Sequence, residues 1–221
     1  MPALLLALAL ASTPPPDARV VEEIVAVVRN PASAPPRVVT LTKLTEEARI
    51  ALVSRGASAA ATGPLDAEAL RAALDWLLDQ MLLADDAARL RVDEVPREDV
   101  VAELRRFRAH FAVPQDYARF LSGSDLTEDE LLATLARMVR VQRYVASRVG
   151  RAARVPDAEV DRWLRDRGVT AAPGPTREAA RAQIADDRTR AQVKELIAEL
   201  RARAEVRIVS APRDVAGEGT P

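Results

Sequence analysis

Residues 20–28 read VVEEIVAVV, and this stretch determines the first element of secondary structure. Val and Ile are enriched in strands, so the run predicts a β-strand. Arg29-Asn30-Pro31 and Pro35-Pro36 interrupt it, and Val38-Val39-Thr40-Leu41 then resumes as a second strand. Together these segments predict an N-terminal β-hairpin joined by a Pro-rich loop.

The other end of the chain carries a third strand signal. Residues 205–209, EVRIV, partly alternate between polar and apolar side chains, which is typical of a strand. Because an isolated hairpin is marginally stable in water, a third strand from the C-terminus would complete a small antiparallel sheet. We therefore predict that the two ends of the chain meet.

Helix signals fill the chain between these strands. Thr127 and Glu130 form a capping box, with Leu126 and Leu131 placed as a hydrophobic staple. Asp66 is a suitable N-cap for a long helix that ends near residue 90. The expected helices cover about residues 43–54, 66–90, 96–111, 114–123, 127–150, 156–168 and 177–204. The sequence thus predicts a mainly α fold, a multi-helix domain with a small three-stranded antiparallel sheet.

Composition limits the class of protein. The 221 residues are 48% hydrophobic and 29% charged, which is the balance of a globular chain. The net charge of −1 gives no whole-chain attraction to nucleic acid or acidic membranes. The sequence has no cysteine, which excludes disulfides, thiolate metal sites and a cysteine nucleophile.

The N-terminus resembles an export signal. Residues 4–11, LLLALALA, form a short apolar run that ends in a small-x-small cleavage pattern. No Lys or Arg precedes the run, so either an earlier start precedes it or the signal is weak. We assign residues 1–11 to a signal peptide, 12–19 to a Pro-rich linker, 20–209 to the folded domain and 210–221 to a disordered tail. The expected location is the periplasm of a Gram-negative type of envelope, with no transmembrane segment.

Three segments follow one another in an order typical of a known family. They are the strand at 24–28 with its turn, strand and helix, the stretch VPDAEVDRWL at 155–164, and the helix from 177 that leads to the strand at 205–209. This order resembles the SurA family of periplasmic chaperones over about residues 20–209. In that family a similar V-(S/T/P)-D-x-E-(V/I) stretch precedes a parvulin-type prolyl isomerase domain, and a long helix and a short strand follow it.

The isomerase domain has no room here. Only a short linker separates Gly168 from Thr176, whereas a parvulin domain needs roughly a hundred residues. The resemblance therefore implies ATP-independent holding of unfolded exported or outer-membrane proteins, without prolyl isomerisation and without a cofactor. Two alternatives stay open: a non-catalytic structural or interaction subunit for a dedicated envelope partner, and a nucleic-acid-binding protein. Homodimer formation also stays open.

No motif in the sequence indicates catalysis. His110 is the one histidine, and no compact motif supplies it with an orienting partner and a nucleophile. The pairs Asp85-Asp86 and Asp186-Asp187 diverge by about 100° on a helix, so we interpret both as solvated faces. Gly-rich phosphate loops do not occur. We expect neither an enzyme nor a metal site.

Two sets of side chains are candidates for binding. The candidates for peptide contact are aromatic: Phe107, Phe111, Tyr117, Phe120 and Trp163. Aromatic rings give contact area at low entropic cost, and Tyr117 and Phe120 are expected to be partly exposed. The alternative for this set is core packing, because most of these residues sit at helical spacing.

The second candidate set is basic. From residue 131 to residue 156 there are six arginines and no acid. A helical wheel places five side chains on one face, opposite the apolar stripe: Arg137, Arg140, Tyr144, Arg148 and Arg151. Such a face suits an anionic partner. The alternative is a solvated face that pairs with acids from neighbouring helices.

Overall fold

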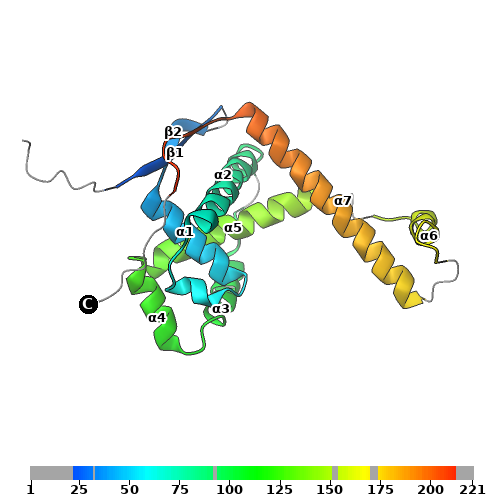
Figure 1. Ribbon diagram of the computed structural model, residues 1–221, viewed down its shortest axis with the longest axis horizontal. Coiled ribbons are helices and arrows are strands. Elements are labelled where there is room, and N and C mark those ends of the chain that lie inside the picture. The colour runs from blue at the N-terminus through cyan, green and yellow to red at the C-terminus, as the bar shows by residue number, and fades with distance from the viewer. Residues whose placement is uncertain (1–21, 32, 92–93, 151–153, 170–173, 213–221) are drawn as a thin grey trace, which may run out of the picture.

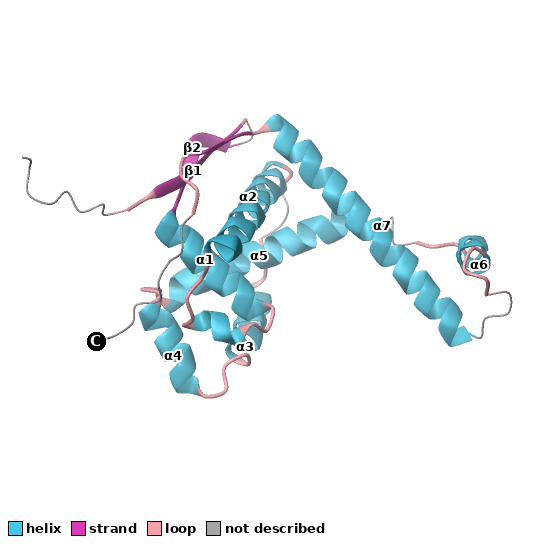
Figure 2. Ribbon diagram, in the orientation of Figure 1, coloured by secondary structure: helices cyan, strands magenta, loops and turns pink. Residues whose placement is uncertain are grey.

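The computed structural model describes residues 22–31, 33–91, 94–150, 154–169 and 174–212 of the chain. It shows a mainly helical protein with one three-stranded antiparallel sheet, which confirms the predicted fold class (Figures 1 and 2). The predicted signal peptide and linker lie outside the described residues.

The sheet joins the two ends of the folded domain. Its strand order is β2-β1-β3, with β1 at Ile24–Asn30, β2 at Ser33–Thr40 and β3 at Glu205–Ile208. Val27 pairs with Val38 on one side and with Arg207 on the other. The predicted meeting of the hairpin with the C-terminal strand is therefore confirmed. The Ser210 hydroxyl, just beyond β3, donates a hydrogen bond to the Glu23 carboxylate of the segment before β1.

The hairpin differs from the prediction at its loop. Pro35 and Pro36 lie inside β2 and not in a Pro-rich loop, and the turn at Pro31 is short. β2 is an edge strand, and its register with β1 is irregular between Val28 and Asn30. Prolines are tolerated in such strands because a missing N–H need not break the ladder. The loop prediction was wrong for this reason.

The helices begin and end close to their predicted positions. Asp66 caps α2 by accepting a hydrogen bond from the Ala69 N–H at 2.7 Å, and Thr127 with Glu130 forms the capping box of α5. Proline lies at the start of α3, α4 and α6, where the missing N–H costs nothing. The helices are α1 Leu41–Ser54, η1 Ser58–Ala61 (a short 3₁₀ helix), α2 Ala67–Arg89, α3 Arg97–Arg108, α4 Pro114–Gly123, α5 Glu128–Val149, α6 Asp157–Arg165 and α7 Gly174–Arg203.

Two apolar clusters hold the body of the protein together. In the first, α2 packs between α1, α5 and the end of α7, beneath one face of the sheet. In the second, α3 and α4 pack on the N-terminal part of α5 and on α1. Aliphatic side chains form most of the first cluster.

A third cluster lies on an arm. We define the arm as α6 together with α7 up to Ile184, and its buried residues are Val155, Val160, Leu164, Ala180 and Ile184. The C-terminal half of α7 contributes Leu196 and Leu200 to the body. Ile184 and Leu196 lie twelve residues apart, about 18 Å along the helix, and the segment between them exposes Asp186 and Asp187 to solvent. The arm therefore stands away from the body at the far end of α7 (Figure 1).

Candidate functional site

The aromatic candidates of α3 and α4 meet in one cluster. The ring centroids of Phe107 and Phe120 lie 5.5 Å apart, and those of Phe111 and Tyr117 lie 5.7 Å apart in an edge contact. These tilted arrangements are the favourable ones for aromatic rings. The turn at residues 109–113 brings the end of α3 and the start of α4 together and so assembles the cluster.

This cluster belongs mainly to the core. Phe107 is 1% exposed and Phe120 is 0% exposed, so the expected partial exposure of Phe120 was wrong. Leu131 and Leu135 of α5 lie in the same apolar cluster and help to bury both rings. The alternative of core packing therefore describes these two residues. Phe111 and Tyr117 are half-buried, and they are the members of this cluster closest to the surface.

Tyr117 has internal partners for its polar end. Its hydroxyl donates to the Glu128 carboxylate at 2.9 Å, and the Arg108 guanidinium lies 4.7 Å from its ring centre and bonds to the same carboxylate. Burial is the main cause that raises the pKa of the Tyr117 hydroxyl. The charged side chains of Glu128 and Arg108 therefore cover the Tyr117 side of the aromatic cluster.

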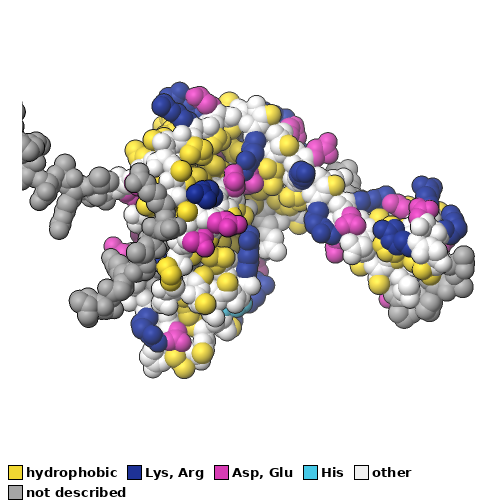
Figure 3. Space-filling model, in the orientation of Figure 1, with side chains coloured by type: hydrophobic (Ala, Val, Ile, Leu, Met, Phe, Trp, Pro, Cys, Tyr) yellow, Lys and Arg dark blue, Asp and Glu magenta, His cyan; other side chains and the backbone are white. Residues whose placement is uncertain are grey.

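Trp163 is the aromatic candidate that lies elsewhere. It sits on α6 in the arm, half-buried against the cluster that includes Val160 and Ile184. The Arg167 guanidinium lies 3.6 Å from the centre of its ring, which is the geometry of a cation–π contact. On the visible face of the arm, hydrophobic side chains lie between basic and acidic ones (Figure 3).

The predicted arginine face is not an open surface. Tyr144 is 1% exposed, and its hydroxyl donates to the Asp86 carboxylate of α2. Arg137 and Arg140 are half-buried, and Arg148 is exposed. Arg151 lies outside the described residues. The placement of Tyr144 on a solvent face was wrong, because the end of α2 packs against this part of α5 and covers it.

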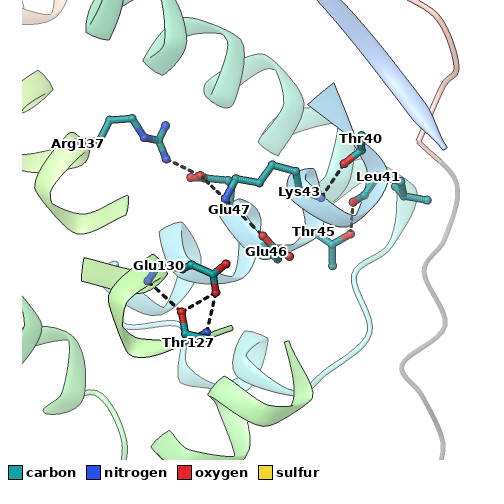
Figure 4. A network of polar contacts seen from close by, with 9 residues as sticks. All are labelled: Thr40, Leu41, Lys43, Thr45, Glu46, Glu47, Thr127, Glu130 and Arg137. Carbon is teal, nitrogen blue, oxygen red and sulfur yellow. Dashed lines mark hydrogen bonds and ion pairs between the residues drawn. The ribbon is translucent and has the colours of Figure 1, made fainter. Parts of the chain in front are cut away.

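Arg137 pairs with a buried acid. Its guanidinium bonds to Glu47 of α1, which is 1% exposed, and the ammonium of Lys43 lies 3.3 Å from the same carboxylate oxygen (Figure 4). The alternative of pairing with acids from neighbouring helices therefore describes Arg137. The ion pair ties α1 to α5.

Asp85 and Asp86 form a second internal polar group. Asp85 accepts hydrogen bonds from Asn30 at 2.9 Å and from Arg37 at 2.6 Å, which ties α2 to the sheet. Asp86 accepts from Tyr144 and from Arg89. Both carboxylates are buried, so their interpretation as a solvated face was wrong. Burial raises the pKa of Asp86, but the hydrogen bonds from Tyr144 and Arg89 outweigh it and hold the pKa below its ordinary value.

The remaining polar candidates lie where the sequence indicated. Asp186 and Asp187 are exposed, and Asp187 pairs with Arg190 at 2.6 Å. His110 is half-buried just after α3, beside Gly56. Within the described ranges, no group of three or more acidic or histidine side chains is placed to hold a metal ion. Over the same ranges, no helix has the length and apolar character needed to cross a bilayer.

Exposed apolar side chains gather at the sheet. They include Ile24 of β1, Val38 of β2, Ile208 of β3 and Val209, which follows β3. Arg29 and Glu205 lie on the same sheet as an exposed ion pair at 3.6 Å. Val38 and Ile208 lie on opposite faces of the sheet, because Val38 pairs with Val27 whereas Ile208 pairs with the buried Ala26.

The burial of Tyr144 between α5 and α2 can be tested through the pKa of its hydroxyl. Burial, followed by the hydrogen bond to Asp86, raises its pKa from 10.0 to about 12. In a Tyr117→Phe variant, Tyr144 is the one tyrosine left, and its phenolate absorbance is expected to appear with a midpoint of about 12. The free energy of unfolding is expected to fall between about pH 10 and 12, because the unfolded chain loses this proton first. A midpoint near 10 with the helices still folded would contradict the buried hydrogen bond.

Comparison with known proteins gives no relatives. No protein-family model, no curated protein and no solved structure matches this chain. The resemblance to SurA-type chaperones therefore stays an expectation from the sequence pattern.

Proposed function

We propose that the protein is an ATP-independent chaperone of the periplasm, which holds unfolded exported or outer-membrane proteins without isomerising prolyl bonds. The arm is the observation that carries this proposal. It is a two-helix unit with a small apolar cluster, joined to the body through α7 across an exposed polar segment. The five core residues of the arm are buried, and its accessible apolar surface is formed by the half-buried ring of Trp163 and by the exposed Val169.

The surface of the arm suits weak and broad binding. Trp163 offers a large ring whose one face is covered by Arg167, and Val169 at the end of the same segment is exposed. Charged residues such as Asp161 and Arg177 surround this apolar surface and pair with each other. Apolar surface interrupted by charge can bind unfolded segments while limiting self-association.

Suppression of aggregation tests the proposal. Several unrelated unfolded proteins, including a denatured outer-membrane protein, are expected to aggregate more slowly in the presence of the chain and without ATP. Replacement of Trp163 by Ala is expected to weaken this holding several-fold, because it removes the largest ring of the arm. The matched control is Trp76→Phe, which changes the tryptophan of the body that packs near Arg55.

Fluorescence separates binding from damage to the arm. The chain has two tryptophans, so Trp76→Phe leaves Trp163 as the sole reporter. Addition of an unfolded client is expected to shift its emission. Unchanged emission, together with full holding by Trp163→Ala, would exclude the arm as the binding surface.

N-terminal sequencing of the native protein from an envelope fraction tests export, with an expected start near Ser12.

The second candidate is a non-catalytic interaction subunit for one envelope partner. The burial of Phe107 and Phe120 favours it, because these rings then offer no contact surface for unfolded chains. The panel of clients discriminates between the two functions. A chaperone acts on several unrelated clients, whereas a dedicated subunit acts on none of them.

A further inference from the structure

Among the described residues, β3 forms one edge of the sheet. The Val209 N–H donates to the Val25 carbonyl at 2.9 Å, and Arg207 pairs with Val27. In an antiparallel ladder, backbone groups of successive residues point alternately toward and away from the neighbouring strand. The N–H and C=O groups of Val206 and Ile208 therefore point away from β1.

The two edges of the sheet are unequal. Pro35 and Pro36 lie in β2, and proline at an edge blocks the addition of another strand. β3 contains no proline, its Ile208 side chain is 52% exposed, and in the part of the chain that the structure describes β3 has β1 as its one partner. The sheet is thus protected at β2 and open at β3.

The charges of β3 complement one another across a two-fold axis. Glu205 and Arg207 are both exposed and lie on the same face of the strand, because they are two residues apart. We propose that two copies of the chain pair through antiparallel β3 strands about an axis at Val206. In this register Glu205 of each copy lies opposite Arg207 of the other, and Ile208 lies opposite Ala204.

The same charges disfavour the neighbouring registers. An axis at Arg207 would place two guanidinium groups opposite each other, and an axis at Glu205 would oppose two carboxylates. Like charges directly opposite each other destabilise a strand pair, whereas opposite charges stabilise it. The axis at Val206 also lets the outward N–H and C=O of Val206 bond to those of the second copy. The product is a continuous six-stranded sheet with the prolines of β2 at both ends.

The oligomeric mass of the full chain in solution tests this inference. The wild-type chain is expected to form a dimer that dissociates on dilution. Arg207→Glu opposes carboxylates at both symmetric positions and is expected to weaken the dimer about tenfold or more. Arg71→Glu is the matched control, because Arg71 is exposed on α2 and carries the same change of charge.

A mixing experiment gives the sharpest outcome. Glu205→Arg alone is also expected to weaken the dimer, whereas an equal mixture of Arg207→Glu and Glu205→Arg chains is expected to form heterodimers, since opposite charges then face each other. Val206→Pro removes an N–H that points away from β1, so it is expected to give a folded monomer. A wild-type chain that stays monomeric at high concentration, or a mixture that does not associate, would overturn the inference. So would a dimer that Arg207→Glu leaves unchanged.

Discussion

Replacement of Arg137 by Met is expected to lower the free energy of unfolding by about 3 kcal/mol, because it leaves the buried carboxylate of Glu47 without its main partner. Glu47 is 1% exposed, and its Oε2 atom is buried without a hydrogen-bond donor among the described residues. Lys43 lies 3.3 Å from Oε1, but its side chain is 47% exposed, so it compensates only in part. Urea unfolding followed by circular dichroism measures the change.

A double variant separates the ion pair from the packing around it. Glu47→Leu with Arg137→Met replaces both charges by apolar groups, and its stability is expected to lie within about 1 kcal/mol of wild type or above it. Arg190→Met removes a partner from the exposed pair with Asp187 and is expected to cost less than about 0.5 kcal/mol. An Arg137→Met variant as stable as this control would show that the pair contributes nothing.

The local features of the fold could be predicted from the sequence because they depend on neighbours in the chain. The capping box of Thr127 and Glu130 and the N-cap at Asp66 formed as expected, since each joins residues three positions apart. The match of the strand at 205–209 with the hairpin was a long-range prediction. It succeeded because a lone hairpin needs a further strand.

The partners of the buried acids could not be predicted from the sequence pattern of one helix alone. Glu47 lies in the same stripe of α1 as Leu44, Ala48 and Ala51, at helical spacing, so an apolar face surrounds it. Asp85 likewise continues the stripe of Leu78 in α2. An acid inside an apolar stripe is a signal of a buried partner. The identity of that partner depends on how α1, α2 and α5 pack, which periodicity does not determine.

The expected exposure of Phe120 was wrong for a related reason. The sequence predicts that Phe107 and Phe111 share one face of a helix, but helical spacing does not show whether another helix covers that face. In the structure α4 and α5 cover it. Trp163 lies on α6, which packs mainly on α7 and outside the aromatic cluster of the body, and it is the aromatic candidate that the proposed function retains.

Replacement of Phe120 by Ala is expected to lower the free energy of unfolding by about 3 to 5 kcal/mol, which is the usual cost of removing a fully buried aromatic ring. Phe120 is 0% exposed and contacts Phe107 and Phe111, with ring centroids 5.5 and 5.6 Å away. The cavity would lie between α3, α4 and α5, so these helices are expected to lose protection from hydrogen exchange first. Tyr117→Phe is the control, because it keeps the ring and removes one hydrogen bond, worth about 1 kcal/mol.

A second substitution at Phe120 tests whether its ring only packs in the core or also binds clients. Phe120→Leu keeps an apolar side chain of moderate volume, so it is expected to fold with a smaller loss of stability than Phe120→Ala. If the ring serves only packing, the folded Phe120→Leu variant holds clients as well as the wild type does, whereas Trp163→Ala does not. If the Phe120→Leu variant has wild-type stability but holds clients more weakly, then clients bind at the aromatic cluster and not at the arm. Because Phe120 and Trp163 lie in different apolar clusters, the two substitutions report on the body and on the arm separately.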